Sequence, residues 1–196
     1  MQQRGLDVLY DQAESHGGYF TTRQAGEAGI STRLLTYYTA AGDIDRVAHG
    51  VYRLARFPPH RFGDAIAATL WVGPGSAVSH DSALAVYGLG ASMPAVVHVS
   101  VARTFRGSRD GVVVHVAPLA PEETTVWDDV AVVSVARALV DVATDVDPSL
   151  ASDAAQDAIR RGLITPDRIS VYLSGHPDRQ RLTRLLLPAT EQSSTS

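Results

Sequence analysis

The first quarter of the chain carries two hydrophobic patterns in succession. From residue 30 to residue 41 the apolar side chains stand three or four positions apart, which predicts a helix with one buried face. They are Ile30, Leu34, Leu35, Tyr38 and Ala41. From residue 44 to residue 54, apolar residues flank the tripeptide Ala48-His49-Gly50, which predicts two strands joined by a turn. We therefore expect a helix followed closely by a hairpin.

Capping signals place a second, shorter helix directly before this one. Thr21 or Thr22 can accept a hydrogen bond from an unpaired backbone N–H at a helix start. Gly29 suits the left-handed conformation that ends many helices. Ser31 repeats the start signal, and Gly42 repeats the stop signal. Two helices joined by a short turn with glycine form a helix-turn-helix, and the hairpin adds a wing.

The outward face of the second helix is polar and able to form hydrogen bonds, as a surface that reads base edges must be. Arginines on the hairpin are placed to reach phosphates or the minor groove. From the residues alone, the helix pair and hairpin of 1–57 suit DNA binding, and a mere packing unit or a protein-binding winged helix stays the alternative; together with the family resemblance given below, we predict DNA binding. The predicted contacts are Thr32, Arg33, Thr36 and Tyr37 on the recognition helix, Arg46, His49 and Arg53 on the wing, and Arg23 on the first helix.

A second domain is expected after Phe57-Pro58-Pro59, because consecutive prolines continue neither a helix nor a strand ladder. Helical segments alternate there with short β-branched runs. The expected strands are 96–101, 112–116 and 130–135, with the first two joined as a hairpin by the charged loop 103–110. The expected helices are 62–72, 79–88, 134–141, 148–161, 166–173 and 178–187. The fold class is therefore α+β, with a small sheet flanked by helices over 58–187 and a disordered tail over 188–196.

Composition and charge exclude several classes of protein and of active site. The net charge is −4, and the first 57 residues hold six arginines and six acidic residues, which argues against indiscriminate coating of nucleic acid. All 17 basic residues are arginine, so a Walker A lysine or a Schiff-base lysine is excluded. No cysteine is present, and no apolar run approaches the roughly 20 residues that span a bilayer. We expect a cytoplasmic protein without a signal peptide, a membrane contact or a cofactor.

Three groups of polar residues in the second domain are candidates for a catalytic or metal site. His80-Asp81-Ser82 is better explained as a helix start, with His80 near the domain surface, than as part of a catalytic triad, whose members converge from separate elements. His98 and His115 would be neighbours on paired strands, but spacing places no third ligand, so half-buried sheet positions are expected. Arg137 and Asp141 stand four apart and are expected to pair structurally. We predict neither a catalytic site nor a metal site.

The segment "GYFTTRQAGEAGIS…AAGDIDRVAHGVYRL" resembles the N-terminal domain of AbiEi-type antitoxins from type IV toxin–antitoxin systems. "AVSHDSALAVYGL" and "SVARALVD" resemble later segments of the same family, with Ala138 where threonine is usual. The resemblance implies a non-enzymatic antitoxin whose partner is a nucleotidyltransferase-type toxin encoded beside it. It also implies binding to inverted repeats in the antitoxin's own promoter DNA, and autorepression.

Two other functions stay open from the sequence. A plain transcription factor, whose second domain binds a ligand or dimerises, would bind an operator without rescuing cells from a neighbouring toxin. A purely protein-binding antitoxin would rescue them even without the arginines of the winged helix. Arginines near the C-terminal end form either a solvated face, extra DNA contacts or a docking surface for an acidic partner. They are Arg160, Arg161, Arg179, Arg181 and Arg184.

Overall fold

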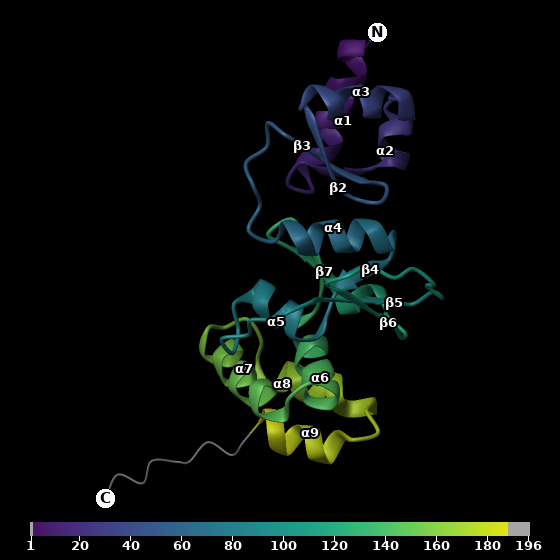
Figure 1. Ribbon diagram of the computed structural model, residues 1–196. Coiled ribbons are helices and arrows are strands. Elements are labelled where there is room, and N and C mark those ends of the chain that lie inside the picture. The colour runs from purple at the N-terminus through teal and green to yellow at the C-terminus, as the bar shows by residue number, and fades with distance from the viewer. Residues whose placement is uncertain (1, 188–196) are drawn as a thin grey trace, which may run out of the picture.

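The computed structural model describes residues 2–187, and the side chains of residues 2–6 and of Gln12 lie outside the description. The segment 188–196, expected to be a disordered tail, also lies outside it. Figure 1 shows the chain built in layers, with the N-terminal helices at one end, a small sheet beneath them, the helix α4 (Gly63–Val72), a larger sheet, and the C-terminal helices at the other end.

The N-terminal unit contains the predicted helix-turn-helix and hairpin. Its elements are α1 (Gln2–Glu14), β1 (Tyr19–Thr21), α2 (Thr22–Glu27), α3 (Thr32–Ala41), β2 (Ile44–Ala48) and β3 (Val51–Leu54). Thr21 caps α2 in a capping box with Gln24, and Ser31 caps α3 by accepting from the backbone N–H of Leu34. Gly42 ends α3 in the left-handed conformation. The capping predictions are confirmed.

The strand β1 was not expected, and it completes the small sheet in the order β1-β3-β2. A strand of three residues is too short to show an alternation of apolar and polar side chains in the sequence. Only its pairing with β3 in the structure identifies β1 as a strand. One predicted core residue is wrong: Ala41, at the last turn of α3, is exposed, whereas Ile30, Leu35 and Tyr38 are buried as expected.

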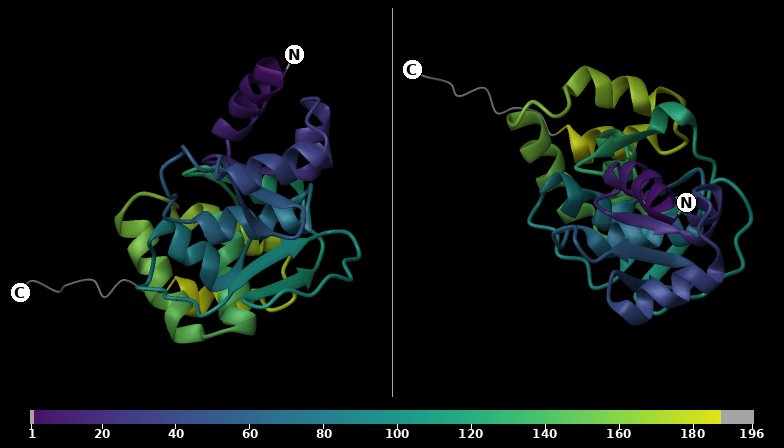
Figure 2. Two further views of the ribbon diagram at one scale, coloured as in Figure 1. Left: turned by 45° about the horizontal axis from the view of Figure 1, so that its top comes forward. Right: turned by 90° about the horizontal axis from the view of Figure 1, so that it is seen from above.

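The helix α4 is buried between two sheets. Tyr19 and Val51, from the small sheet, share one hydrophobic cluster with Ile66 of α4. Ala68 and Val72, on another side of the same helix, pack with Val99 and Val101 of the larger sheet. A helix that is apolar nearly all round is typical of such a central position. The view from above in Figure 2 agrees, since the N-terminal elements lie over the rest of the chain.

The larger sheet has five strands in the order β6-β5-β4-β8-β7. They are β4 (Ser76–Val78), β5 (Val97–Val101), β6 (Val112–Val116), β7 (Thr124–Trp127) and β8 (Val130–Val133). The sheet flanked by helices that was predicted for the second domain is therefore confirmed. It is this five-stranded sheet, with α4 on one face and α5 (His80–Tyr87) on the other (Figure 1).

The expected hairpin between residues 101 and 112 is wrong, because β5 and β6 run parallel. The ten residues between them carry the chain back along the sheet instead of making a tight turn. Two strands were also missed. β4 has three residues and is buried throughout, and β7 pairs with β8 across a turn at Asp128 and Asp129, both at positive φ. Aspartate tolerates that conformation, so the Trp127-Asp128-Asp129-Val130 sequence did carry a hairpin signal.

The remaining helices lie close to their expected positions. They are α6 (Val135–Asp145), α7 (Pro148–Arg160), α8 (Pro166–Tyr172) and α9 (Arg179–Leu186), with short 3-10 turns at Pro121–Glu123 and Leu173–Gly175. α6 packs on α5, α7 packs on α6, and α9 packs on α7, which forms the lower layers of Figure 1. Within residues 2–187, no helix has the length and apolar character that crossing a bilayer requires.

Candidate nucleic-acid interface

One face of α3 is exposed to solvent. Thr32, Arg33, Thr36 and Tyr37 are all exposed, and the side chain of Tyr37 is 65% exposed. Tyr37 meets the buried Tyr38 edge to face, with ring centroids 5.6 Å apart, which fixes its direction without covering it. Arg33 forms no ion pair within the described residues, and it is the only charged residue of α3. This surface therefore offers one unpaired guanidinium among hydroxyl groups.

The wing supplies two further exposed groups. Arg46, on β2, and His49, in the turn, are both exposed, and their nitrogens Nη2 and Nδ1 lie 3.4 Å apart. The turn is anchored to the start of α2, since the backbone N–H of Thr22 donates to the carbonyl of Gly50 at 2.9 Å. The helix α3 packs directly on β2, and β3 packs on α4, so the wing is held between the recognition helix and the second unit.

The structure places the other two predicted contacts differently. Arg53 is mostly buried, and its guanidinium donates to Asp45 at 2.6 Å and to the carbonyl of Phe57 at 3.1 Å. Arg23 is exposed on α2 and pairs with Glu27 at 2.5 Å. It borders a hollow shared with the Gly73–Ser76 segment of the second unit. Neither side chain lies among the α3 hydroxyl groups in the way that Arg33 does.

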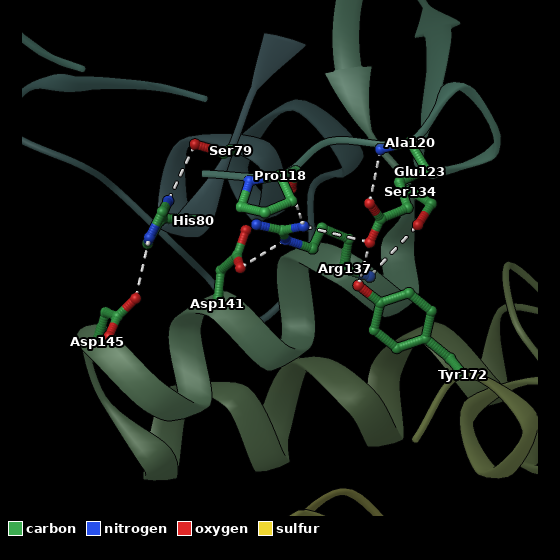
Figure 3. Close-up of polar contacts among 10 residues, drawn as sticks. All are labelled: Ser79, His80, Pro118, Ala120, Glu123, Ser134, Arg137, Asp141, Asp145 and Tyr172. Atoms are coloured by element: carbon green, nitrogen blue, oxygen red, sulfur yellow. Dashed lines mark hydrogen bonds and ion pairs between the residues drawn. The ribbon is translucent and has the colours of Figure 1, made fainter. Parts of the chain in front are cut away.

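A buried polar network joins the sheet and helices of the second unit around Arg137 (Figure 3). Arg137 donates to Asp141 at 2.7 Å, to Glu123 at 3.2 Å and to the carbonyl of Pro118 at 3.0 Å. The hydroxyl of Tyr172 donates to Glu123 at 2.5 Å. The Arg137–Asp141 pair within α6 is confirmed and mostly buried. The contacts of Arg137 with Pro118 and Glu123, and of Glu123 with Tyr172, tie α6 to the segment before β7 and to α8.

This network holds two carboxylates against one guanidinium. Burial raises the pKa of Asp141 to about 6, although Arg137 opposes the shift, and one oxygen of Asp141 has no hydrogen-bond partner within the described residues. Burial also tends to raise the pKa of Glu123, but hydrogen bonds from Tyr172, the Ala120 N–H and Arg137 outweigh it and lower that pKa. We interpret the network as structural because all its members point at one another.

Three of the five histidines of the second unit lie together, and the place of His80 among them was not expected from the sequence. His98 Nδ1 and His115 Nε2 are 2.8 Å apart on β5 and β6, as expected for neighbouring strands. His80 joins them, with its ring stacked on His115 at 3.8 Å between centroids. The expectation that His80 packs near the surface is wrong, since it is 3% exposed.

The helix start expected at His80-Asp81-Ser82 is present, but neither Ser79 nor Ser82 caps the helix with its side chain, as a serine at a helix start commonly does. Ser79 stands at the start of α5 without a side-chain capping bond and instead contacts His80 Nδ1 at 2.9 Å. Ser82 bridges two backbone groups of the strand region, Val96 and His98.

The histidine cluster also affects proton binding. Burial is the largest cause that lowers the pKa of His115, and the neighbouring His80 and His98 lower it further, to about 4.

Comparison with known proteins gives one sequence match and one informative likeness of fold. The crystal structure of the RV2827C protein from Mycobacterium tuberculosis superposes with a TM-score of 0.53 at 15% identity, over 94% of this chain and 76% of that one. At this identity, the likeness shows the fold alone. No curated protein matches the chain by sequence. The family model described as "Transcriptional regulator, AbiEi antitoxin" matches residues 7–55, which is the winged helix-turn-helix from α1 to β3.

Proposed function

We propose that this chain is an antitoxin that also represses its own operon. In this proposal the N-terminal unit binds inverted repeats in the promoter, and the second unit supports neutralisation of a nucleotidyltransferase-type toxin encoded nearby. The observation that carries the proposal is the match of residues 7–55 to AbiEi antitoxin regulators. It coincides with a recognition helix whose free face bears only hydrogen-bonding groups and one unpaired arginine.

The proposed DNA surface has a centre and a rim. Thr32, Arg33, Thr36 and Tyr37 would enter the major groove, where an arginine suits the paired acceptors of guanine. Arg46 and His49 would follow the adjacent backbone or minor groove from the wing. Arg23 and Arg53 would contribute only after releasing Glu27 and Asp45, so we assign them secondary phosphate contacts.

Specific affinity in this proposal comes from the placement of charged and hydrogen-bonding groups on one face and not from net charge. The domain is electrically neutral overall, so few phosphates can be neutralised and the salt dependence should be shallow. A second copy of the domain on the second half-site would supply the remaining affinity, as is usual for regulators that bind repeats. The proposed regulator therefore binds one repeat weakly and a pair of repeats well.

The test of DNA binding uses the full chain and its own upstream DNA. Binding to a labelled promoter fragment is measured at 50 and 200 mM salt, beside an unrelated fragment of equal length. Promoter-selective binding that weakens with salt is the expected result. Equal binding to both fragments would refute the repressor part of the proposal.

Toxin neutralisation needs a separate test in cells. The neighbouring toxin gene is induced with and without this chain, and growth is followed. Rescue by the wild type and by the Arg33→Ala variant alike would assign neutralisation to a surface outside the recognition helix, as proposed. If the chain binds its promoter but never rescues growth, it is a transcription factor without antitoxin function.

A further inference from the structure

The three histidines lie where three segments of the second unit converge. His98 and His115 stand on adjacent parallel strands, and His80 is the first residue of α5, two residues after β4 ends. One ring nitrogen from each lies within 4.8 Å of the others. Val99 and Val101 pack against α4 from the opposite face of β5, so the alternation of a strand directs His98 away from α4. The cluster therefore lies on the α5 side of the sheet, apart from the packing of α4.

The backbone conformation of His80 and the burial of its ring are both energetically unfavourable. Its backbone has a φ of 55°, a left-handed conformation that non-glycine residues adopt rarely. Its side chain is buried, and Nε2 lies 3.5 Å from Asp145 without a hydrogen-bond partner within the described residues. Nδ1 is already occupied by the hydroxyl of Ser79. A buried nitrogen whose nearest partner is the Asp145 carboxylate at 3.5 Å (Figure 3) is only weakly satisfied, and a closer ligand would lower the free energy.

Carboxylates stand next to the imidazoles, as they do around metal-bound histidines. Asp81 Oδ1 lies 3.7 Å from His98 Nε2, on the side of the ring away from His115. That oxygen is buried and lacks a hydrogen-bond partner within the part of the chain described. Asp145 lies beside His80 at the end of α6. Two negative charges next to three imidazoles favour occupation of this site by a cation.

We propose that His80, His98 and His115 bind one divalent transition-metal ion, of which Zn²⁺ fits the ligand set best. Imidazole nitrogens suit zinc, and Mg²⁺ and Ca²⁺ prefer oxygen. Zn–N bonds of about 2.0–2.1 Å separate two ligand nitrogens by about 3.3 Å, close to the 2.8 Å between His98 Nδ1 and His115 Nε2. Binding requires the stacked ring of His80 to rotate so that Nε2 joins this pair. Asp81 and Ser79 then hold the second nitrogens of His98 and His80.

The ion would lock β5, β6 and the start of α5 together. These segments belong to the unit that we assign to neutralisation, but metal binding does not depend on that assignment. The test therefore measures binding directly. Chelator-stripped full-length protein is titrated with Zn²⁺ by calorimetry, with Mg²⁺ as the non-imidazole control. One Zn²⁺ per chain and no heat with Mg²⁺ are expected.

Variants identify the ligands. His98→Gln and His115→Gln, both partly buried, should each weaken Zn²⁺ binding by about tenfold or more. His176→Gln, at a histidine outside the cluster, is the matched control and should bind as the wild type does. Circular dichroism of the metal-free proteins establishes that each variant is folded. Equal Zn²⁺ affinity in all four proteins would overturn the proposal.

A readout on the wild type alone covers the case in which a variant does not fold. Co²⁺ replaces Zn²⁺, and the visible absorption spectrum is recorded. Intense d–d bands, typical of a four- or five-coordinate site with nitrogen ligands, are expected. A spectrum equal to that of aqueous Co²⁺ at saturating protein would mean that the histidines form only a stacked, hydrogen-bonded core.

Discussion

At the scale of single residues, the structure separates arginines that the sequence could not rank. Arg33 and Arg53 both belong to the predicted DNA-binding set, but Arg53 is engaged by Asp45 and by the Phe57 carbonyl. Arg33 has no such partner among residues 2–187. Arg53 would have to break this partly buried ion pair before it contacted DNA, which costs free energy. Among the described residues, Arg33 has no pair to break. In the proposed DNA complex, Arg33 is therefore the arginine that we expect to contact a base.

Replacing Arg33 by alanine should weaken binding to the promoter fragment by about 1–3 kcal/mol and relax sequence preference at one base pair. Fluorescence anisotropy with the wild-type site and with single-base variants measures both effects. Arg168→Ala is the matched control, because Arg168 is also exposed but lies on α8 at the far end of the molecule. Loss of affinity without any change in preference would make Arg33 a phosphate contact.

Asp141 leads to a prediction about pH. Its pKa of about 6 exceeds the ordinary 3.8, so the folded chain holds this proton more tightly than the unfolded chain does. Protonation therefore favours folding as the pH falls from about 6 toward 4. Asp141→Asn cannot titrate. The wild type should gain about 2 kcal/mol in unfolding free energy relative to this variant between pH 7 and pH 4.5. Urea unfolding at both values measures the gain, and parallel pH profiles would contradict it.

At the scale of elements, the sequence predicts the long helices that have capping residues, but it does not predict the strands of three residues. The helix α3 has a cap, a periodic face and a glycine stop, so its bounds follow from local chemistry. The strands β1 and β4 have three residues each and exist only through distant partners. The pairing of His98 with His115 was predicted, but the place of His80 was missed for the same reason, because only the position of β4 brings His80 beside the β5–β6 pair.

The packing of α4 against the small sheet depends on a glycine. A methyl group at Gly63 would stand 2.2 Å from the Tyr19 hydroxyl, so Gly63→Ala must displace Tyr19 or α4. We expect a loss of about 1–3 kcal/mol in unfolding free energy, the usual range for overpacking. Gly26→Ala in α2 meets nothing within 4 Å and should be neutral or slightly stabilising. Chemical denaturation measures both variants, and equal effects would show that the Tyr19 contact is not rigid.

At the scale of the whole molecule, the two predicted domains share a core. Tyr19 and Val51 belong to the N-terminal sheet, yet they are buried in the cluster that is built mainly by the second unit. The wing therefore has helices on one face and α4 on the other, and its orientation depends on the second unit. A signal that displaces α4 would also displace the wing.

This shared core predicts that the full chain unfolds in one cooperative transition. Near- and far-ultraviolet circular dichroism should give the same midpoint, although the proposed functions lie in different units. A fragment of residues 1–60 exposes Tyr19 and Val51, whose burial is worth roughly 1.5–3 kcal/mol each. It should therefore unfold at a lower temperature and bind the promoter less tightly than the full chain. Two separate transitions in the full chain, or a fragment that matches its stability and DNA affinity, would show that α4 is only a tether.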